Sequence, residues 1–158
     1  MVYLRTGNSS SDSCFRGYTV SEGPLKTKTP FGVQWERYQA PAIYDAKAYV
    51  NGGGYGGAYS FDLATGEQRW FTSLAQDDGW TPAINDRHLV AYVGGTLTEL
   101  DRNTGVAMQN MASPAFSWNG WTSSTPVLDG DFAYISSGCL VKFDLTQGKG
   151  GMVLVRCE

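Results

Sequence analysis

The residues of this chain that could do acid, base or metal chemistry are few and scattered. The one histidine, His88, stands between Arg87 and Leu89 at the start of a predicted strand. A lone histidine there is more typical of a surface or turn residue than of a general base or metal ligand. The acidic pair Asp77-Asp78 could offer oxygens to calcium, but the residues after it lack the alternating ligands of a calcium loop. The sequence therefore predicts no catalytic residue and no metal site.

Two loops rich in aromatic and polar residues, 76–80 and 116–121, are better candidates for a ligand site. Aromatic rings beside amide and carboxylate groups suit stacking on, and hydrogen bonding to, a flat or sugar-like ligand. The candidate ligand-binding residues are Trp80, Trp118, Asn119 and Trp121. The alternative, which we favour, is that Trp80 and Trp121 pack between neighbouring sheets. Trp118 is the tryptophan that we expect to be exposed.

Two of the three cysteines lie symmetrically about a predicted turn. Cys139 begins one predicted strand, Cys157 ends the next, and Gly148 lies midway between them. In an antiparallel pair this symmetry places the two thiols opposite each other, so a disulfide and two reduced, buried cysteines are both open. A disulfide would imply an oxidising compartment, either extracellular or periplasmic or lumenal, whereas reduced thiols would allow the cytoplasm. The sequence leaves the state of Cys14 open.

The elements that must position these residues are short hairpins, and one hairpin recurs. In residues 58–70, Phe61 and Leu63 place apolar side chains on one face of a strand, an aspartate accepts hydrogen bonds from turn amides, and a glycine supplies a positive φ. The turn aspartate returns after 39 residues and again after 43. The residues of this repeat motif are Asp62, Thr65, Gly66 and Trp70, then Asp101, Thr104 and Gly105, then Asp144 and Gly148.

A second phrase precedes each hairpin, and the spacing of both phrases predicts the fold. It starts with a proline, at Pro41, Pro82 and Pro126. Its second half is a triplet that aligns Ala48-Tyr49-Val50 with Ala91-Tyr92-Val93 and Ala133-Tyr134-Ile135. A period near 40 residues with four short strands per period is the signature of a β-propeller blade. The sequence thus predicts an all-β protein with about three four-stranded antiparallel blades and a leading strand, as a partial ring or fragment.

The hairpin motif resembles the repeat of the pyrroloquinoline-quinone-like (PQQ-like) β-propellers, A-x-D-x-x-T-G-x-x-x-W. The resemblance covers roughly residues 14–158 and implies that the tryptophan of one blade docks on the next blade. Ser60 replaces the alanine of the motif, Gln109 and Met152 stand where the second and third tryptophans belong, and Gln147 replaces a threonine. We expect these departures to weaken docking between blades without changing the fold.

The composition excludes several classes of protein. With 158 residues, 13% of them aromatic, the chain is long enough for one domain with a core. The net charge of -3 and the lack of lysine or arginine runs argue against nucleic acid or an anionic membrane surface as a partner. No apolar run approaches the ~20 residues of a membrane helix, and the first residues lack the order of a signal peptide.

We expect all of the chain to belong to one propeller domain. Its predicted parts are a polar N-terminal arm at 1–13, a lead-in and closing strand at 14–39, blade 1 at 40–76, blade 2 at 77–113 and blade 3 at 114–158. Three blades and one strand cannot close a ring, since propellers have typically 4 to 8 blades. The rest comes from a longer propeller, from further copies in a homo-oligomer, or from another subunit. We favour the first of these.

The favoured function is a noncatalytic PQQ-like scaffold for protein interaction or assembly, within a larger propeller or complex and without a cofactor. One alternative is a fragment of a PQQ-dependent dehydrogenase, with PQQ and calcium bound. The resemblance would then require calcium ligands, a catalytic aspartate and adjacent cysteines, and none is identifiable in the sequence. A second alternative is a glycan-binding module that uses Trp118 and Trp121. Fold alone does not decide among the three.

Overall fold

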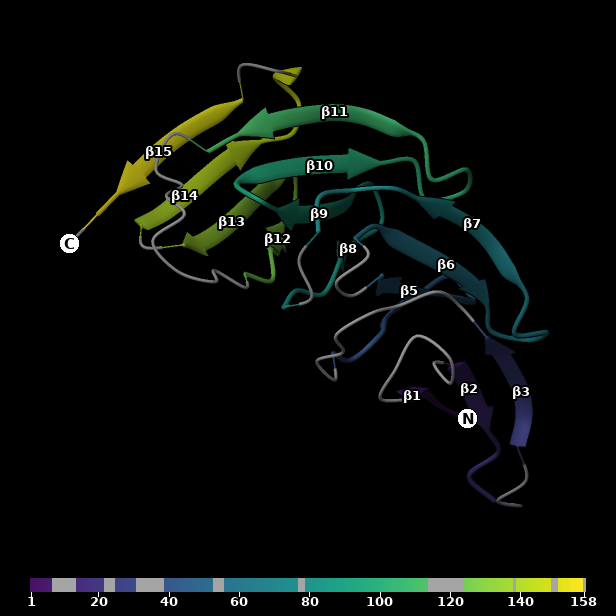
Figure 1. The fold of residues 1–158 in the computed structure, drawn as a ribbon. Coiled ribbons are helices and arrows are strands. Elements are labelled where there is room, and N and C mark those ends of the chain that lie inside the picture. Colours follow the sequence, from purple (N-terminus) through teal and green to yellow (C-terminus); the bar gives the residue numbers. More distant parts are fainter. Residues whose placement is uncertain are drawn as a thin grey trace.

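The computed structural model describes residues 1–6, 14–21, 25–30, 39–52, 56–76, 79–113, 124–137, 139–148 and 151–157. Within these ranges all regular structure is β-strand, arranged in four antiparallel sheets. Figure 1 shows the sheets side by side in an arc that follows the chain, from the purple N-terminal end to the yellow C-terminal end. The predicted all-β class and the four-stranded blades are confirmed.

The first sheet has three strands and each later sheet has four. The N-terminal sheet contains β1 (Val2–Thr6), β2 (Cys14–Tyr18) and β3 (Leu25–Pro30). Blade 1 contains β4 (Ala42–Tyr44), β5 (Lys47–Asn51), β6 (Ala58–Asp62) and β7 (Gln68–Thr72). Blade 2 contains β8 (Ala83–Ile84), β9 (Leu89–Val93), β10 (Thr96–Leu100) and β11 (Ala107–Ala112). Blade 3 contains β12 (Val127–Asp129), β13 (Phe132–Ser137), β14 (Cys139–Asp144) and β15 (Met152–Arg156).

The N-terminal sheet differs from the sequence-based expectation. Residues 1–13 were expected to form a polar arm, but Val2–Thr6 is a strand that pairs with Cys14–Tyr18. Its sequence alternates apolar and other side chains, which suits a strand at the border of a sheet. The lead-in and closing strand expected at 14–39 contains two strands, Cys14–Tyr18 and Leu25–Pro30, and its residues 22–24 and 31–38 lie outside the described residues.

Three apolar clusters hold successive sheets together. One lies between the N-terminal sheet and blade 1, one between blades 1 and 2, and one between blades 2 and 3. Because neighbouring residues of a strand point to opposite faces, Ala48 and Val50 enter the first cluster and Tyr49 enters the second. Burying a large apolar side chain in such a cluster contributes about 1.5–3 kcal/mol. The stability of the arc therefore resides in the junctions between sheets.

A repeated bulge shows which residues of the four sheets are structurally equivalent. The pairing of the two strands that flank each outer turn shifts after Gly17, Ser60, Glu99 and Lys142. These four residues therefore hold one equivalent position. Their pairing partners on the next strand inward hold a second equivalent position. These partners are Tyr3, Tyr49, Val90 and Tyr134.

Two sequence alignments need correction in this frame. The equivalent of Tyr49 in blade 2 is Val90 and not Tyr92, so the triplet there lies two residues further along the strand. In blade 3, Met152 pairs with Phe143 as Gln68 pairs with Phe61 in blade 1, so Met152 is the equivalent of Gln68. The equivalent of Trp70 in blade 3 is Leu154. The third turn is longer: the amide of Asp144 reaches the carbonyl of Gly151, whereas that of Asp62 reaches Glu67.

Candidate functional site

Each outer turn is built around the carboxylate of the motif aspartate. Oδ1 of Asp62 accepts hydrogen bonds from the amides of Ala64 and Thr65, at 2.9 and 3.1 Å. Oδ1 of Asp101 accepts from the amides of Asn103 and Thr104, at 2.9 and 2.8 Å. These donors favour the ionised form, so the backbone hydrogen bond from Thr65 lowers the pKa of Asp62, and that from Thr104 lowers the pKa of Asp101.

The third turn keeps this chemistry with a shifted threonine. Oδ1 of Asp144 accepts from the hydroxyl of Thr146 at 2.7 Å and from its amide at 2.9 Å. The hydroxyl contact is the main reason why the pKa of Asp144 is lowered. Gly148 has a positive φ of 64°, like Gly66 at 74° and Gly105 at 76°. The motif aspartates and glycines thus act in turn formation.

The turns also receive the preceding sheet, through one repeated contact. We call the backbone oxygen of the residue directly after each motif aspartate the turn carbonyl. The indole Nε1 of Trp70 donates to the turn carbonyl of Arg102 at 3.1 Å, and the hydroxyl of Tyr49 lies 3.4 Å from the same oxygen. In the preceding junction the hydroxyl of Tyr3 donates to the turn carbonyl of Leu63 at 2.8 Å. Each junction therefore fixes the next blade at the same backbone atom.

The junction between blades 2 and 3 uses a glutamine for this contact. Nε2 of Gln109 donates to the turn carbonyl of Leu145 at 2.8 Å and also to the carboxylate of Glu99. Gln109 therefore keeps the polar contact, because a side-chain amide supplies the same kind of N–H donor as an indole, and the expectation of weaker docking stays a prediction. Gln109 also contacts the carboxylate of Glu99, which therefore takes part in the junction.

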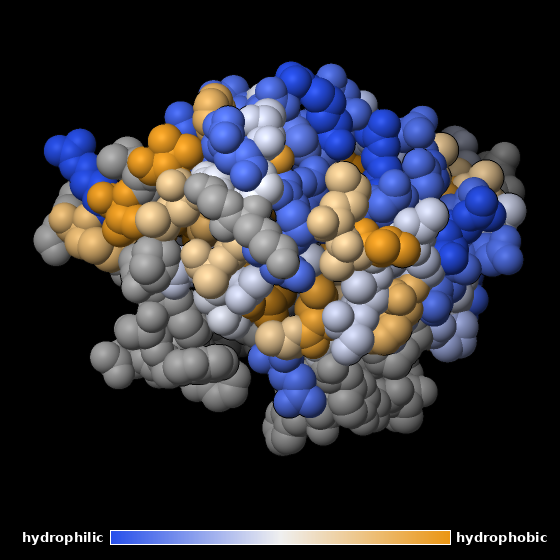
Figure 2. Space-filling model, turned by 90° about the horizontal axis from the view of Figure 1, so that it is seen from above, coloured by the Kyte–Doolittle hydropathy of each residue, from blue (hydrophilic) through white to orange (hydrophobic). Residues whose placement is uncertain are grey.

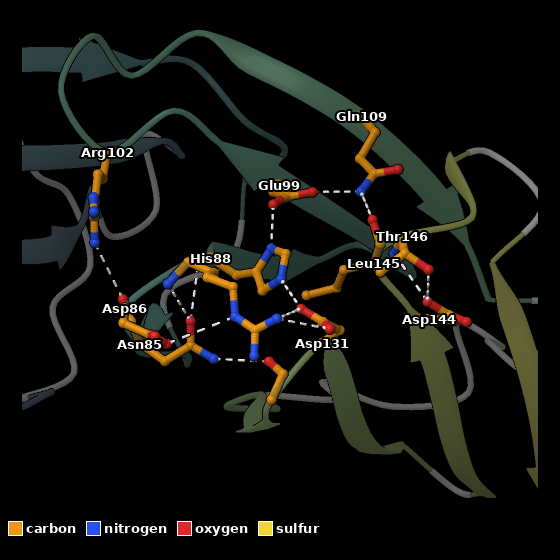
Figure 3. A network of polar contacts seen from close by, with 12 residues as sticks. Asn85, Asp86, His88, Glu99, Arg102, Gln109, Asp131, Asp144, Leu145 and Thr146 are labelled. Atoms are coloured by element: carbon orange, nitrogen blue, oxygen red, sulfur yellow. Dashed lines mark hydrogen bonds and ion pairs between the residues drawn. The ribbon is translucent and has the colours of Figure 1, made fainter.

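That carboxylate belongs to a charged network that spans the same junction (Figure 3). Nδ1 of His88 lies 2.6 Å from Oε1 of Glu99, and Nε2 of His88 lies 2.9 Å from Oδ1 of Asp131. Arg87 adds a second contact to Asp131, at 2.8 Å. His88 and Glu99 come from blade 2, and Asp131 comes from the turn between β12 and β13 of blade 3. The side chain of Glu99 is only 4% exposed, so its carboxylate depends on these partners.

The network determines how His88 titrates. Burial opposes protonation of the ring, but hydrogen bonds from the ring to Glu99 and Asp131 outweigh it and raise the pKa of His88 above its usual 6.5. The hydrogen bond that Asp131 accepts from His88 in turn lowers the pKa of Asp131. His88 was expected to be a surface or turn residue, and the structure instead places it in a bridge between blades. One histidine gave no signal of this, because its two partners lie 11 and 43 residues away.

Of the candidate ligand-binding residues, Trp80 lies within the described part of the chain. Trp80 is fully buried in the cluster between blades 1 and 2, and its carbonyl accepts a hydrogen bond from the side chain of Asn51. Packing between sheets, the alternative that we favoured, is thus what the structure gives for Trp80. Trp118, Asn119 and Trp121 lie outside the described residues, as do Asp77 and Asp78.

The predicted cysteine pair is joined in the structure. A disulfide connects Cys139, at the start of β14, to Cys157, directly after β15, with Cα atoms 4.4 Å apart. It closes the end of the hairpin opposite the turn at Gly148. The register argument from the sequence is confirmed here, and the alternative of two reduced thiols is not observed.

The dehydrogenase alternative would require calcium with PQQ. Across the described ranges, no group of three or more His, Cys, Asp or Glu side chains is arranged to hold a metal. Within the same ranges, His88 is paired with Glu99 and Asp131. No helix in the described part of the chain is both long and apolar enough to cross a membrane.

Comparisons with known proteins identify the fold. No family model matches the sequence, and no curated protein matches it. Among solved structures the chain is similar to BamB from Moraxella catarrhalis, with 17% identity, a TM-score of 0.71, and 97% of this chain matched to 48% of that one. It is also similar to the quinohemoprotein alcohol dehydrogenase ADHIIG from Pseudomonas putida HK5, with 14% identity, a TM-score of 0.70, and 98% of this chain matched to 32% of that one.

A europium-containing methanol dehydrogenase is a further similar structure, with 17% identity, a TM-score of 0.59, and 73% of this chain matched to 23% of that one. The chain thus spans less than half the length of each of these three proteins. Their likeness confirms the fold that the repeat motif predicted, that of the PQQ-like β-propellers. At these identities it carries no function with it.

Proposed function

We propose that the chain is a noncatalytic scaffold of the PQQ-like propeller type, which contributes blades to a larger propeller or complex. The proposal rests on one observation: the titratable side chains described above are hydrogen-bonded within the blades or between them. His88, Glu99 and Asp131 form a saturated bridge between two blades, and the motif aspartates are occupied by their own turns. Partners within and between the blades are what a structural role would require of these side chains, and this supports the proposal.

A fragment of a quinone-dependent dehydrogenase is the competing function, because two of the similar structures are dehydrogenases. It is tested by titrating the purified chain with PQQ, with and without calcium, while quinone absorbance and tryptophan fluorescence are recorded. The scaffold proposal expects no saturable change in either signal. Saturable, calcium-dependent binding would overturn it in favour of the dehydrogenase, and selective binding on a glycan array would favour the glycan-binding alternative.

The scaffold proposal also concerns partners and compartment. The disulfide between Cys139 and Cys157 supports an oxidising compartment, outside the cytoplasm, as the place where the protein works. Gentle extraction of the native protein, followed by chemical cross-linking and mass determination, tests the proposal. We expect complexes that contain other polypeptides, and a native protein recovered only as itself would contradict a scaffold role for other proteins.

A further inference from the structure

The two ends of the arc carry faces that are buried at every internal junction. The C-terminal face is the side of blade 3 that points away from blade 2, and we define it by Val127, Tyr134, Leu140 and Lys142. The equivalents of Leu140 are Ala58 in blade 1 and Leu97 in blade 2, which are 1% and 0% exposed, whereas Leu140 is 45% exposed. Figure 2 shows hydrophobic residues gathered at the left side of the molecule, where blade 3 lies.

The N-terminal face is the matching half of such a junction. It is the side of the N-terminal sheet that points away from blade 1, and we define it by Val2, Leu4 and Tyr18. In register, Leu4 corresponds to Val50, which packs on the preceding sheet and is 2% exposed, whereas Leu4 is 43% exposed. Val2 corresponds in the same way to the buried Ala48. At Val2 and Leu4 one end thus presents apolar side chains that the other end lacks, whereas Cys14 on the same side of the sheet is buried.

The polar contact of the junctions can also be completed between these two faces. Tyr134 holds the position of Tyr3 and Tyr49, whose hydroxyls both point at the turn carbonyl of the following blade. On the N-terminal sheet, Val20 lies three residues after the bulge position Gly17, as Leu63 lies three residues after Ser60. The carbonyl of Val20 is therefore the equivalent of a turn carbonyl and could accept the hydroxyl of Tyr134. Val20 is exposed and lies on the border of the N-terminal face.

We propose that the C-terminal face of one copy binds the N-terminal face of a second copy, and that the reverse contact closes a ring of two chains. The contact is head-to-tail, and a two-fold axis closes it, which avoids an open filament. Two copies supply eight sheets, within the four to eight of known propellers. This inference rests on the proposed scaffold function and names its first partner.

The test measures the mass of the purified 158-residue chain by sedimentation equilibrium. We expect twice the chain mass of 17.2 kDa, and a protein that stays at the mass of one chain at all concentrations would overturn the proposal. Leu140→Asp places a carboxylate in the contact and should weaken association by at least about a hundredfold. The control is Met108→Asp on β11, a more exposed apolar residue on the outer strand of blade 2, which should leave the dimer intact.

Mixing two variants identifies the contact as head-to-tail. Leu140→Asp and Leu4→Lys should each be monomeric alone, and their mixture should form dimers, because one junction is then wild type and the other pairs opposite charges. Dimers that survive Leu140→Asp, or a mixture that stays monomeric, would overturn the assignment. Far-UV circular dichroism establishes that the variants fold. Quinone binding would contradict the scaffold function and leave the proposed ring of two chains untouched. A monomeric chain would contradict the ring of two chains and leave the result of the quinone titration untouched.

Discussion

At the scale of single residues, the carboxylates of this chain act as structural acceptors. Asp101 receives two backbone amides and the hydroxyl of Thr104 on one oxygen, and Asp62 receives two amides. The motif survives the change to Thr146 in blade 3 because the turn requires only a donor that can reach the carboxylate. The same preference for internal partners places His88 between Glu99 and Asp131.

Removing the carboxylate of Asp101 should destabilise the fold at neutral pH. We expect Asp101→Ala to lower the free energy of unfolding by about 1 kcal/mol, measured by urea denaturation at pH 7. The pKa of Asp101 is lowered on folding, so its contribution is present above its ordinary pKa of 3.8 and is lost as the pH falls through the folded value. The difference between variant and wild type should therefore shrink at pH 2. Asp86→Ala, at an exposed aspartate, is the control and should change little.

His88 should make stability depend on pH on the alkaline side. Its pKa is raised on folding, so its contribution is complete below its unfolded pKa of 6.5 and is lost as the pH rises through the higher folded value. We expect the urea midpoint of the wild type to fall across that interval. His88→Gln should show no such fall, although it is less stable at pH 6. A wild-type profile that matches the variant from pH 5 to 9 would refute the bridge.

At the scale of elements, the junctions depend on close approach between an outer strand and the next turn. A Cβ added to Gly105 would lie 2.6 Å from Oγ1 of Thr72 and 2.7 Å from the ring of Trp70. The hydroxyl of Thr72 donates to the carbonyl of the same glycine at 2.6 Å. The turn glycine is thus needed both for its positive φ and for the space that the preceding blade occupies.

Gly105→Ala and Gly130→Ala separate these two requirements. Both glycines have a positive φ, and the strain of alanine there costs about 1–2 kcal/mol. A Cβ at Gly130 meets nothing within 4 Å, whereas at Gly105 it meets blade 1. We expect Gly105→Ala to cost a further ~1–3 kcal/mol in thermal or urea unfolding. Equal effects of the two variants would mean that blade 1 does not press on this turn.

The sequence predicted the elements that rest on local chemistry. The aspartate turns, the four-strand period and the cysteine register were all readable, because hairpins pair residues at a fixed sum of positions. The N-terminal sheet was missed because Thr19 stands where a motif aspartate would be and Thr27 holds the position of Trp70, so no repeat signal remained. The contact of Gln109 with the carbonyl of Leu145 was missed because the repeat motif has a tryptophan as the docking residue at this position.

The sequence was least informative where distant residues meet. The network around His88 requires the register of two blades to be known before Asp131 can be placed next to the ring. Trp80 illustrates the same limit, since it shares its buried cluster with Tyr49 and Leu89 of two different sheets. Residue types could suggest a ligand site there, and only the packing of the sheets shows that Trp80 belongs to a core.

At the scale of the whole molecule, blade 3 carries a covalent staple. The disulfide of Cys139 and Cys157 ties the two outer strands of blade 3, across a sequence separation of 18. We expect the double variant Cys139→Ser with Cys157→Ser to lose about 3 kcal/mol in urea unfolding.

The control for the disulfide is a reducing agent. It should lower the stability of the wild type to that of the double variant and leave the variant unchanged. A wild type that is indifferent to reduction would show that the staple does not limit unfolding.

A crystal structure of the purified protein tests the central claim most directly, namely that successive sheets are joined through donors aimed at the turn carbonyls. We predict Trp70 Nε1 and Gln109 Nε2 within about 3.2 Å of the carbonyl oxygens of Arg102 and Leu145. We also predict four-stranded sheets arranged around a common axis. Three copies merged into one continuous sandwich, or helices at Asp62, Asp101 and Asp144, would contradict the account.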